Sequence, residues 1–245
     1  MTEHRGMVER HDGLLAGDLS VFVTASHELK SPMALIRQLS LALETGDLDE
    51  SEQVRMLRQI TLTSERALRL TTDITRASRL QNSLFELEPI NPLQLCEDVA
   101  HELTPLYKAH NREIRVASLY RPILAVANRD LLMRILLNFG DNALHYADTS
   151  RPVELRAGSR LRGDAVRISV RDYGPSVPID LWKQLANRLG SDVQTLHGRP
   201  QSSGLGLYVA GQFAQAMKST IGATRHQDGA TFYVDMNAST QLSLL

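Results

Sequence analysis

The sequence predicts an α+β protein in which a long helical hairpin precedes an α/β sandwich, with helices on one face of a mixed sheet. Two observations carry this prediction. Residues 19–80 place apolar side chains at helical spacing, whereas the chain after Leu84 interleaves helical segments with strand-like hairpins. With 245 residues, the chain is long enough for two small domains that each bury a core.

The first predicted helix runs from about Leu19 to Glu44. Gly46 can end it in a left-handed cap, and a second helix is predicted from Asp49 to Leu80. Because a lone hairpin leaves apolar surface uncovered, we expect two copies to pair into a four-helix bundle, which makes a homodimer. The first helix has a bundle-type stripe at Leu19, Phe22, Ser26, Leu29, Met33, Ile36, Ser40 and Leu43.

The second domain is predicted to begin near Leu84, where the composition changes and prolines punctuate the chain. Helices are predicted over 92–109, 128–147 and 205–217. Strands are predicted over 85–88, 114–119, 153–157, 165–170, 221–225 and 231–236. The expected domain bounds are 1–18 for an N-terminal linker, 19–82 for the hairpin, 83–239 for the sandwich and 240–245 for a tail.

The bulk composition excludes some classes of protein. The formal net charge is -1, so no overall field favours nucleic acid, and we expect no nucleic-acid partner. The one cysteine, Cys96, cannot form an internal disulfide and is expected to be a buried, inert thiol. No apolar run approaches the roughly 20 residues that cross a bilayer.

A histidine stands inside the first helix, in the segment Ser26-His27-Glu28-Leu29-Lys30-Ser31-Pro32. Ser26 occupies a stripe position, so His27 falls on the flank of the bundle, within reach of solvent. A neutral imidazole nitrogen is a nucleophile, and the adjacent Glu28 can accept its proton. The alternative is an exposed histidine beside a solvated glutamate. Pro32 in mid-helix costs roughly 3 kcal/mol and so asks for a functional reason.

The helix predicted over 128–147 carries Asn138 and Asn142 one turn apart on one face. An amide oxygen is a neutral, hard ligand that suits Mg²⁺, whose other positions go to water and phosphate oxygens. Two ordinary surface asparagines are the alternative. Asparagine is a mediocre helix former, however, and a pair of them in a leucine-rich helix favours the functional interpretation.

Two glycine-containing loops follow. Asp172 and Gly174 come after a predicted strand, where a carboxylate can accept a hydrogen bond from the exocyclic amine of adenine; a plain turn is the alternative. Gly204-Leu205-Gly206 opens a predicted helix, whose N–H groups and positive dipole end suit phosphate. A plain helix entry is the alternative for this second loop.

In this order and spacing, the four elements resemble the sensor histidine kinases of bacterial two-component systems, whose catalytic domain belongs to the ATPase class shared with gyrase and the heat-shock chaperone ATPases. The resemblance spans about Leu19 to Met236. It implies an ATP-dependent protein-histidine kinase that autophosphorylates on His27 and passes the phosphoryl group to a response-regulator aspartate, with ATP and Mg²⁺ as cofactors. The implied partners are a second copy, a cognate response regulator and an upstream sensor domain or sensor protein.

The resemblance also implies roles for single residues. His27 would be the phosphoacceptor and Glu28 its base, and Asn142 would bind Mg²⁺. Residues 181–199 would form the mobile lid over ATP, anchored by Leu181-Trp182. The residues expected at the nucleotide are Asn138, Asn142, His145, Tyr146, Asp172, Gly174, Gly204, Leu205 and Gly206.

This chain departs from the family pattern at several positions. His145 replaces a lysine that would offer phosphate a fixed charge. Ser176 and Ser202 replace glycines, and because serine tolerates positive φ poorly, each is expected to restrict its loop. Ser31, four residues after His27, keeps a hydroxyl where related phosphatases commonly use threonine, which implies that it positions water against a phosphorylated regulator.

Two other functions compete with the kinase. A degenerate kinase would dock regulators or relay phosphate without hydrolysing ATP. A different ATPase of the same class, such as a chaperone or topoisomerase subunit, is the other, although the hairpin with its His27-Glu28 pair speaks against it. For a kinase we expect a cytoplasmic location, either as a free protein or as the cytosolic part of an inner-membrane sensor.

Overall fold

The computed structural model describes residues 3–46, 48–80, 85–117, 123–146, 151–160, 163–180, 182–183, 189 and 205–240. Side chains are described from Val23 onward, except those of His145 and Tyr146. The chain divides into two compact units, and the boundary on the second helix falls between Thr71 and Thr72.

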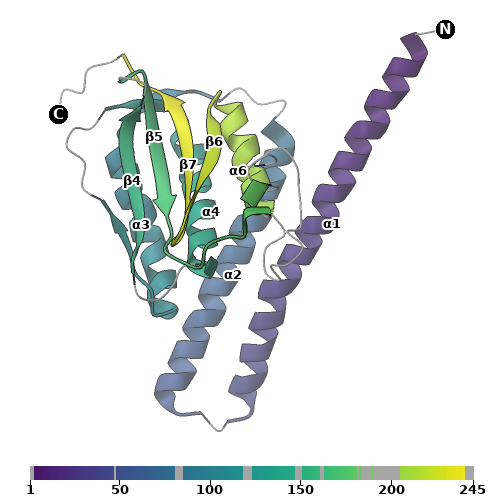
Figure 1. The fold of residues 1–245 in the computed structure, drawn as a ribbon. Helices are drawn as coiled ribbons and strands as arrows, with labels where there is room; N and C mark the ends of the chain where they lie inside the picture. Colours follow the sequence, from purple (N-terminus) through teal and green to yellow (C-terminus); the bar gives the residue numbers. More distant parts are fainter. Residues whose placement is uncertain are drawn as a thin grey trace. The chain divides into compact units, whose positions relative to one another are not determined.

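The helical hairpin is present as predicted (Figure 1). Helix α1 (Glu3–Glu44) begins earlier than the expected Leu19, because helical hydrogen bonding continues beyond the apolar stripe. After α1, Gly46 has a φ of +75°, which confirms the predicted left-handed cap. Helix α2 (Glu50–Arg79) starts at a reciprocal cap. The backbone N–H of Glu52 donates to Asp49 Oδ1 at 2.8 Å, and that of Asp49 donates to Glu52 Oε2 at 3.3 Å.

The sandwich contains a five-stranded sheet in the order β2-β4-β5-β7-β6 (Figure 1). Strand β2 lies parallel to β4, and every other neighbouring pair is antiparallel, which confirms the predicted mixed sheet and both predicted hairpins. The strands are β2 (Ile114–Val116), β4 (Val153–Arg160), β5 (Ala165–Arg171), β6 (Thr220–His226) and β7 (Gly229–Asn237).

A second, two-stranded sheet was not predicted. Strand β1 (Glu88–Ile90) pairs antiparallel with β3 (Ala125–Ala127). The prediction of a strand over 85–88 is therefore wrong except for its last residue, because the alternation there has no partner strand beside it. The strand expected over 114–119 ends at Val116, and its last two residues lie outside the described part of the chain.

Three helices cover one face of the five-stranded sheet: α3 (Pro92–Ala109), α4 (Arg129–Tyr146) and α6 (Leu205–Ala216) (Figure 1). Strand residues alternate between this face and the opposite one. In β5, Val166, Ile168 and Val170 are at most 1% exposed. The core is completed by fully buried helix residues, namely Val99, Leu103, Leu131, Leu132, Ile135, Leu136, Phe139, Ala210 and Phe213.

Cys96 lies in this core and is fully buried, as predicted. Burial raises the pKa of its thiol to about 12, with a smaller contribution from the charge of Glu97. A thiol that stays protonated at neutral pH is a poor nucleophile, so Cys96 acts as a small apolar residue. Among the described helices, none combines the length and the apolar character that crossing a bilayer requires.

The last turns of α2 belong to the second unit and are joined to α4 by two ion pairs. Arg134 of α4 pairs with Asp73, which is 4% exposed, and Arg76 pairs with Asp130 in the first turn of α4. A buried carboxylate is stable only with such a partner, so the Asp73–Arg134 pair fixes where α2 meets α4.

Candidate functional site

Asn138 on α4 and Gly206 on α6 lie next to each other. A Cβ atom added to Gly206 would lie 3.7 Å from Asn138 Oδ1, which is van der Waals contact, so the glycine and the asparagine amide are direct neighbours. The Nδ2 atom of Asn138 is buried and has no hydrogen-bond partner among the described residues. A buried N–H group without an acceptor is costly, about 1–3 kcal/mol, so this amide marks a place where a polar ligand fits.

Asp172 lies just beyond the end of β5 and is 5% exposed. Its Oδ1 atom accepts a hydrogen bond of 3.0 Å from the backbone N–H of Ala230, at the start of β7. Its own backbone N–H donates to the carbonyl of Ala230, also at 3.0 Å. Asp172, whose carboxylate we expect to bind adenine, is therefore held to one residue of the neighbouring strand by one hydrogen bond at its carboxylate and one at its backbone.

Tyr107 of α3 hydrogen-bonds to the asparagine helix, α4. Its hydroxyl donates to the carbonyl of Gly140 at 2.8 Å, and Gly140 stands between Asn138 and Asn142 on α4. Burial raises the pKa of Tyr107, and the charges of Asp141 and Asp172 raise it further. The hydrogen bond from Tyr107 thus ties α3 to the middle of α4.

The loop after Asp172 is fastened to the turn between β6 and β7. The backbone N–H of Gly174 donates to the carbonyl of Asp228 at 3.3 Å. The Ser176 hydroxyl donates to the carbonyl of His226 at 3.3 Å. Ser176 does not adopt a positive φ, and its hydroxyl gains a hydrogen-bond partner, so whether serine restricts this loop stays a prediction.

Glu154 and Tyr173 form a second cluster, which sequence reasoning missed. The Tyr173 hydroxyl donates to Glu154 Oε2 at 3.0 Å, and both residues are less than 9% exposed. Burial would raise the pKa of Glu154, but hydrogen bonds from Arg115, Arg156 and Tyr173 outweigh burial and lower it to about 2. The one signal in the sequence is an acidic residue in an otherwise basic and apolar strand, which does not reveal its partners.

The predicted phosphoacceptor lies on α1, in the first unit. His27 is exposed, as expected for the flank of a bundle helix, and so is Ser31. Glu28 is partly buried. Helix α1 continues on both sides of Pro32, so the histidine and its neighbours belong to one helix.

Several predicted residues cannot be placed. Gly204, Ser202 and residues 190–199 of the expected lid lie outside the described residues, as does Leu181. His145 and Tyr146 end α4, but their side chains are not described. Leu205 begins α6 and is fully buried, and Trp182 is partly buried.

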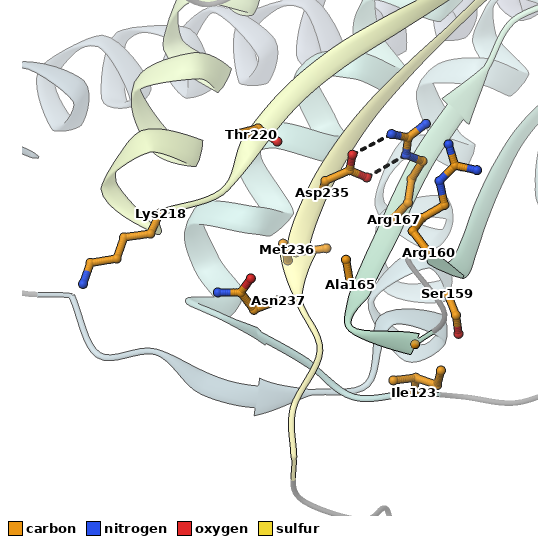
Figure 2. Close-up of a pocket in the computed structure, with 11 residues that line it drawn as sticks. Ile123, Ser159, Arg160, Ala165, Arg167, Lys218, Thr220, Asp235, Met236 and Asn237 are labelled. Atoms are coloured by element: carbon orange, nitrogen blue, oxygen red, sulfur yellow. Dashed lines mark hydrogen bonds and ion pairs between the residues drawn. The ribbon is translucent and has the colours of Figure 1, made fainter.

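Figure 2 shows a pocket at the other end of the sheet, where β5 begins. Arg167 donates two hydrogen bonds to Asp235 there, at 2.6 and 2.5 Å. The pocket is lined by Ile123, Ser159, Arg160, Gly163, Ala165, Arg167, Lys218, Thr220, Asp235, Met236 and Asn237. None of the predicted site residues lines this pocket, so it is separate from the candidate nucleotide site.

The described site residues fit a nucleotide. Asn138 offers a buried donor, Gly206 lies beside it at the start of a helix, and Asp172 offers an acceptor at a strand end. Asn142, one turn beyond Asn138 on the same helix, is partly buried. Its amide oxygen is a ligand of the kind that Mg²⁺ takes when it also binds phosphate oxygens and water.

Comparison with known proteins agrees with this description. Residues 127–240 match the family model described as histidine kinase-, DNA gyrase B- and HSP90-like ATPase. The histidine protein kinase SaeS of Staphylococcus epidermidis is 27% identical over 198 residues, which cover 80% of this chain and 56% of that protein. SaeS of Staphylococcus aureus is 25% identical over 217 residues, which cover 86% of this chain and 61% of that protein. The chain therefore spans less than two thirds of the length of these curated relatives.

Solved structures show the same fold. Full-length ShkA in complex with AMPPNP superposes with a TM-score of 0.61 at 23% identity, covering 92% of this chain and 48% of that chain. The histidine kinase AdeS of Acinetobacter baumannii superposes with a TM-score of 0.57 at 17% identity, covering 87% of this chain and 98% of that chain. Residues 127–240 therefore resemble the histidine kinase-, DNA gyrase B- and HSP90-like ATPases, and the predicted resemblance of the chain to the sensor histidine kinases is confirmed.

Proposed function

We propose that this chain is an ATP-dependent protein-histidine kinase that autophosphorylates on His27 and passes the phosphoryl group to an aspartate of a response regulator. The observation that supports it most directly is that Asn138 lies next to Gly206 and that its buried Nδ2 atom has no hydrogen-bond partner among the described residues. In this proposal residues 19–82 dimerise and carry the phosphoacceptor, and residues 83–239 bind ATP. Residues 1–18 link to the input, and 240–245 form a tail.

The proposed nucleotide contacts follow the geometry of the site. The Asp172 carboxylate accepts a hydrogen bond from the adenine amine, and the backbone around Gly204 and Gly206 binds the phosphates at the start of α6. Asn142 would hold Mg²⁺, which when bound neutralises charge on the phosphates. The remaining contacts proposed for the nucleotide are Asn138, His145, Tyr146, Gly174 and Leu205.

The chemistry proposed for the chain has two phosphoryl transfers. A ring nitrogen of His27 attacks the γ-phosphorus of ATP; the N–P bond forms, the P–O bond to ADP breaks, and ADP leaves with that electron pair. Glu28 accepts the imidazole proton. A carboxylate oxygen of the regulator then attacks the same phosphorus; the O–P bond forms, the N–P bond breaks, and the imidazole leaves with that electron pair and takes up a proton. Exposure of His27 allows both the nucleotide and the regulator to reach it.

Incubation with γ-labelled ATP and Mg²⁺ tests the proposal. Wild-type protein is expected to acquire acid-labile label, and His27→Gln is expected to lose it entirely. His101→Gln is the matched control, because His101 is also an exposed histidine on a helix and has no proposed role. Equal labelling of wild type and His27→Gln would remove His27 from the mechanism.

The competing function is a degenerate kinase that docks regulators or relays phosphate. Titration with ATP and Mg²⁺ separates the two, because a scaffold needs no nucleotide. Measurable binding of ATP, with a dissociation constant that Asp172→Asn raises, supports the kinase. A heat signal indistinguishable from buffer in a protein with a normal thermal melt supports the scaffold.

Ser31 gives the proposal a second activity, removal of phosphate from the regulator. Its hydroxyl is exposed, one helical turn beyond His27, where it can hydrogen-bond to an attacking water. Ser31→Ala is expected to slow decay of the phosphorylated regulator by tenfold or more, on the order of one catalytic hydrogen bond, while His27 is still labelled. If the regulator decays no faster with wild-type protein than alone, the phosphatase activity is absent.

The partners in this proposal are a second copy of the chain, a response regulator and an upstream sensor domain or sensor protein. A second copy is supported by apolar side chains that the hairpin leaves exposed, at 50–60% of their surface: Val23, Met33, Leu41, Val54 and Leu57. Use of ATP assigns the reaction to the cytoplasm.

A further inference from the structure

Tyr173 stands between the two residues that the proposed function assigns to adenine, Asp172 and Gly174, yet its side chain leaves on another side of the loop. Glu154, its hydrogen-bond partner, alternates along β4 with Val153 and Leu155, which are at most 1% exposed and pack toward the helices. Tyr173 therefore reaches the sheet face opposite the helices, whereas Asp172 continues the alternation of Val166, Ile168 and Val170, which pack toward the helices.

The phenol ring of Tyr173 is enclosed by two guanidinium groups. The Arg151 guanidinium carbon lies 3.6 Å from the ring centroid and that of Arg171 lies 4.4 Å from it. Both arginines pair with Asp228 in the turn between β6 and β7, Arg151 at 2.9 Å. Cations over an aromatic face attract the ring, so the ring has one favoured position.

The hydroxyl of Tyr173 is fixed just as tightly. Its acceptor, Glu154, also receives hydrogen bonds from Arg115, at 3.2 and 2.5 Å, and from Arg156, at 3.1 Å. A charged acceptor held by two arginines cannot turn away from the phenol without leaving buried charge unpaired. Two strands, β2 and β4, and the turn before β7 thus hold one side chain of the loop.

We propose that Tyr173 is a positioning residue for the nucleotide: its side chain, bonded to Glu154 and enclosed by Arg151 and Arg171, fixes the loop from the far face of the sheet and so sets where the Asp172 carboxylate stands. The inference rests on the proposed function, in which Asp172 binds adenine.

Gly229 shows how little freedom Asp172 has. It has a φ of +124°, and a Cβ atom there would lie 2.4 Å from the Asp172 carbonyl oxygen and 2.6 Å from Oδ1. The turn thus closes on Asp172 from one side while Tyr173 holds the loop from the other. A shift of the Tyr173 side chain must therefore move Asp172 relative to Ala230, its hydrogen-bond partner.

Binding of two nucleotides tests this role. ATP is compared with purine riboside triphosphate, which lacks the exocyclic amine, by calorimetry with Mg²⁺. Tyr173→Phe is expected to raise the Kd for ATP about tenfold, the size of one hydrogen bond to a charged group, and the Kd for the analogue less than about twofold. Glu154→Gln is expected to do the same, and Tyr173→Phe is expected to add little in the Glu154→Gln background.

Tyr233→Phe is the matched control. Tyr233 lies on the same face of the sheet, under the guanidinium of Arg167 at 3.4 Å, and has no proposed contact with the loop. Tyr233→Phe should leave the Kd for ATP and the Kd for the analogue unchanged. Equal weakening of both nucleotides by Tyr173→Phe would overturn the proposal, because a general loss of stability does not discriminate between bases.

A measurement without nucleotide separates this proposal from the kinase itself. The Ala230 amide donates to Asp172 Oδ1, so its NMR shift and hydrogen exchange report the position of that carboxylate. Tyr173→Phe is expected to shift this resonance and speed its exchange at least tenfold, and Tyr233→Phe is not. An unchanged Ala230 amide would refute the role of Tyr173, whereas wild-type protein that binds no ATP would refute the proposed function only.

Discussion

Glu154 is a carboxylate that is 5% exposed and nevertheless stays charged. Burial alone would raise its pKa, but donors from Arg115, Arg156 and Tyr173 lower it to about 2, against an ordinary value of 4.5. The residue therefore links folding to pH. Its folded-state pKa lies below its unfolded one, so its contribution to stability is present above about pH 4.5 and is lost as the pH falls toward 2.

The free energy of unfolding is expected to fall as the pH is lowered from about 4.5 to 2, with Glu154 contributing on the order of 3 kcal/mol of the loss. Glu154→Gln should make the free energy of unfolding depend less on pH between about 4.5 and 2, and should lower it at neutral pH. Urea denaturation at a series of pH values measures it. Glu97→Gln, at an exposed glutamate on α3, should keep the wild-type slope. A wild-type slope in Glu154→Gln would contradict the prediction.

At the scale of elements, the contact between α3 and α4 decides where the two site asparagines stand. Gly140 lies between Asn138 and Asn142, and a Cβ atom there would lie 2.2 Å from Cδ1 of Leu103, which is fully buried. A side chain at this position would therefore have to displace the buried Leu103 side chain. Tyr107 of α3 adds a hydrogen bond to the Gly140 carbonyl, so α3 holds α4 by shape and by one polar contact.

Gly140→Ala is expected to lower the free energy of unfolding by about 1–3 kcal/mol, because the added methyl group overpacks the contact and outweighs the gain in helix propensity. Chemical denaturation measures the loss. Adding Gly140→Ala to Leu103→Ala should cost less than adding it to the native chain, since space has been made. Gly158→Ala is the control, because a Cβ atom at Gly158 meets nothing within 4 Å. Equal costs in both backgrounds would exclude overpacking.

The loop 172–177 and the turn between β6 and β7 act together as one element. Backbone and side-chain hydrogen bonds join them at Asp172, Gly174, Ser176 and Val177, the last accepting from Arg225 Nε at 2.6 Å. A loop held at so many points loses little further entropy when a ligand binds, which favours affinity.

At the scale of the whole molecule, the chain consists of two compact units, which differ in how far each buries its own apolar side chains. The sandwich buries its own core between helices and sheet. The hairpin has only two helices, and a pair of helices cannot cover both apolar stripes. Met33 at 51%, Val54 at 60% and Leu57 at 55% exposure are what such a hairpin leaves uncovered.

Replacing Val54 and Leu57 together by glutamate is expected to convert a dimer into a monomer, because charged side chains cannot be buried in a four-helix bundle without partners. Light scattering coupled to gel filtration measures the mass. Ile179→Glu is the matched control: Ile179 is equally exposed, at 58%, but belongs to the second unit, and its change should leave the dimer intact. A wild-type chain of monomeric mass at micromolar concentration would contradict the homodimer.

The sequence by itself determined the long elements of this protein. Their signals are local: the apolar stripe and Gly46 defined the end of α1, and the leucine-rich run defined α4, whose two asparagines were recognised within one turn. The two hairpins were also predicted, because each joins two strand-like segments across a short connection.

The tertiary structure alone decided the contacts between distant segments. Strands β1 and β3 have three residues each and exist only because they pair, so no periodicity reveals them. Tyr173 and Glu154 are 19 residues apart, and their bond depends on the register of β4 against β5. Likewise Asn138 meets Gly206 only when α4 and α6 pack on the same face of the sheet. Pairing and packing join residues that are remote in the chain, and a local pattern carries no information about them.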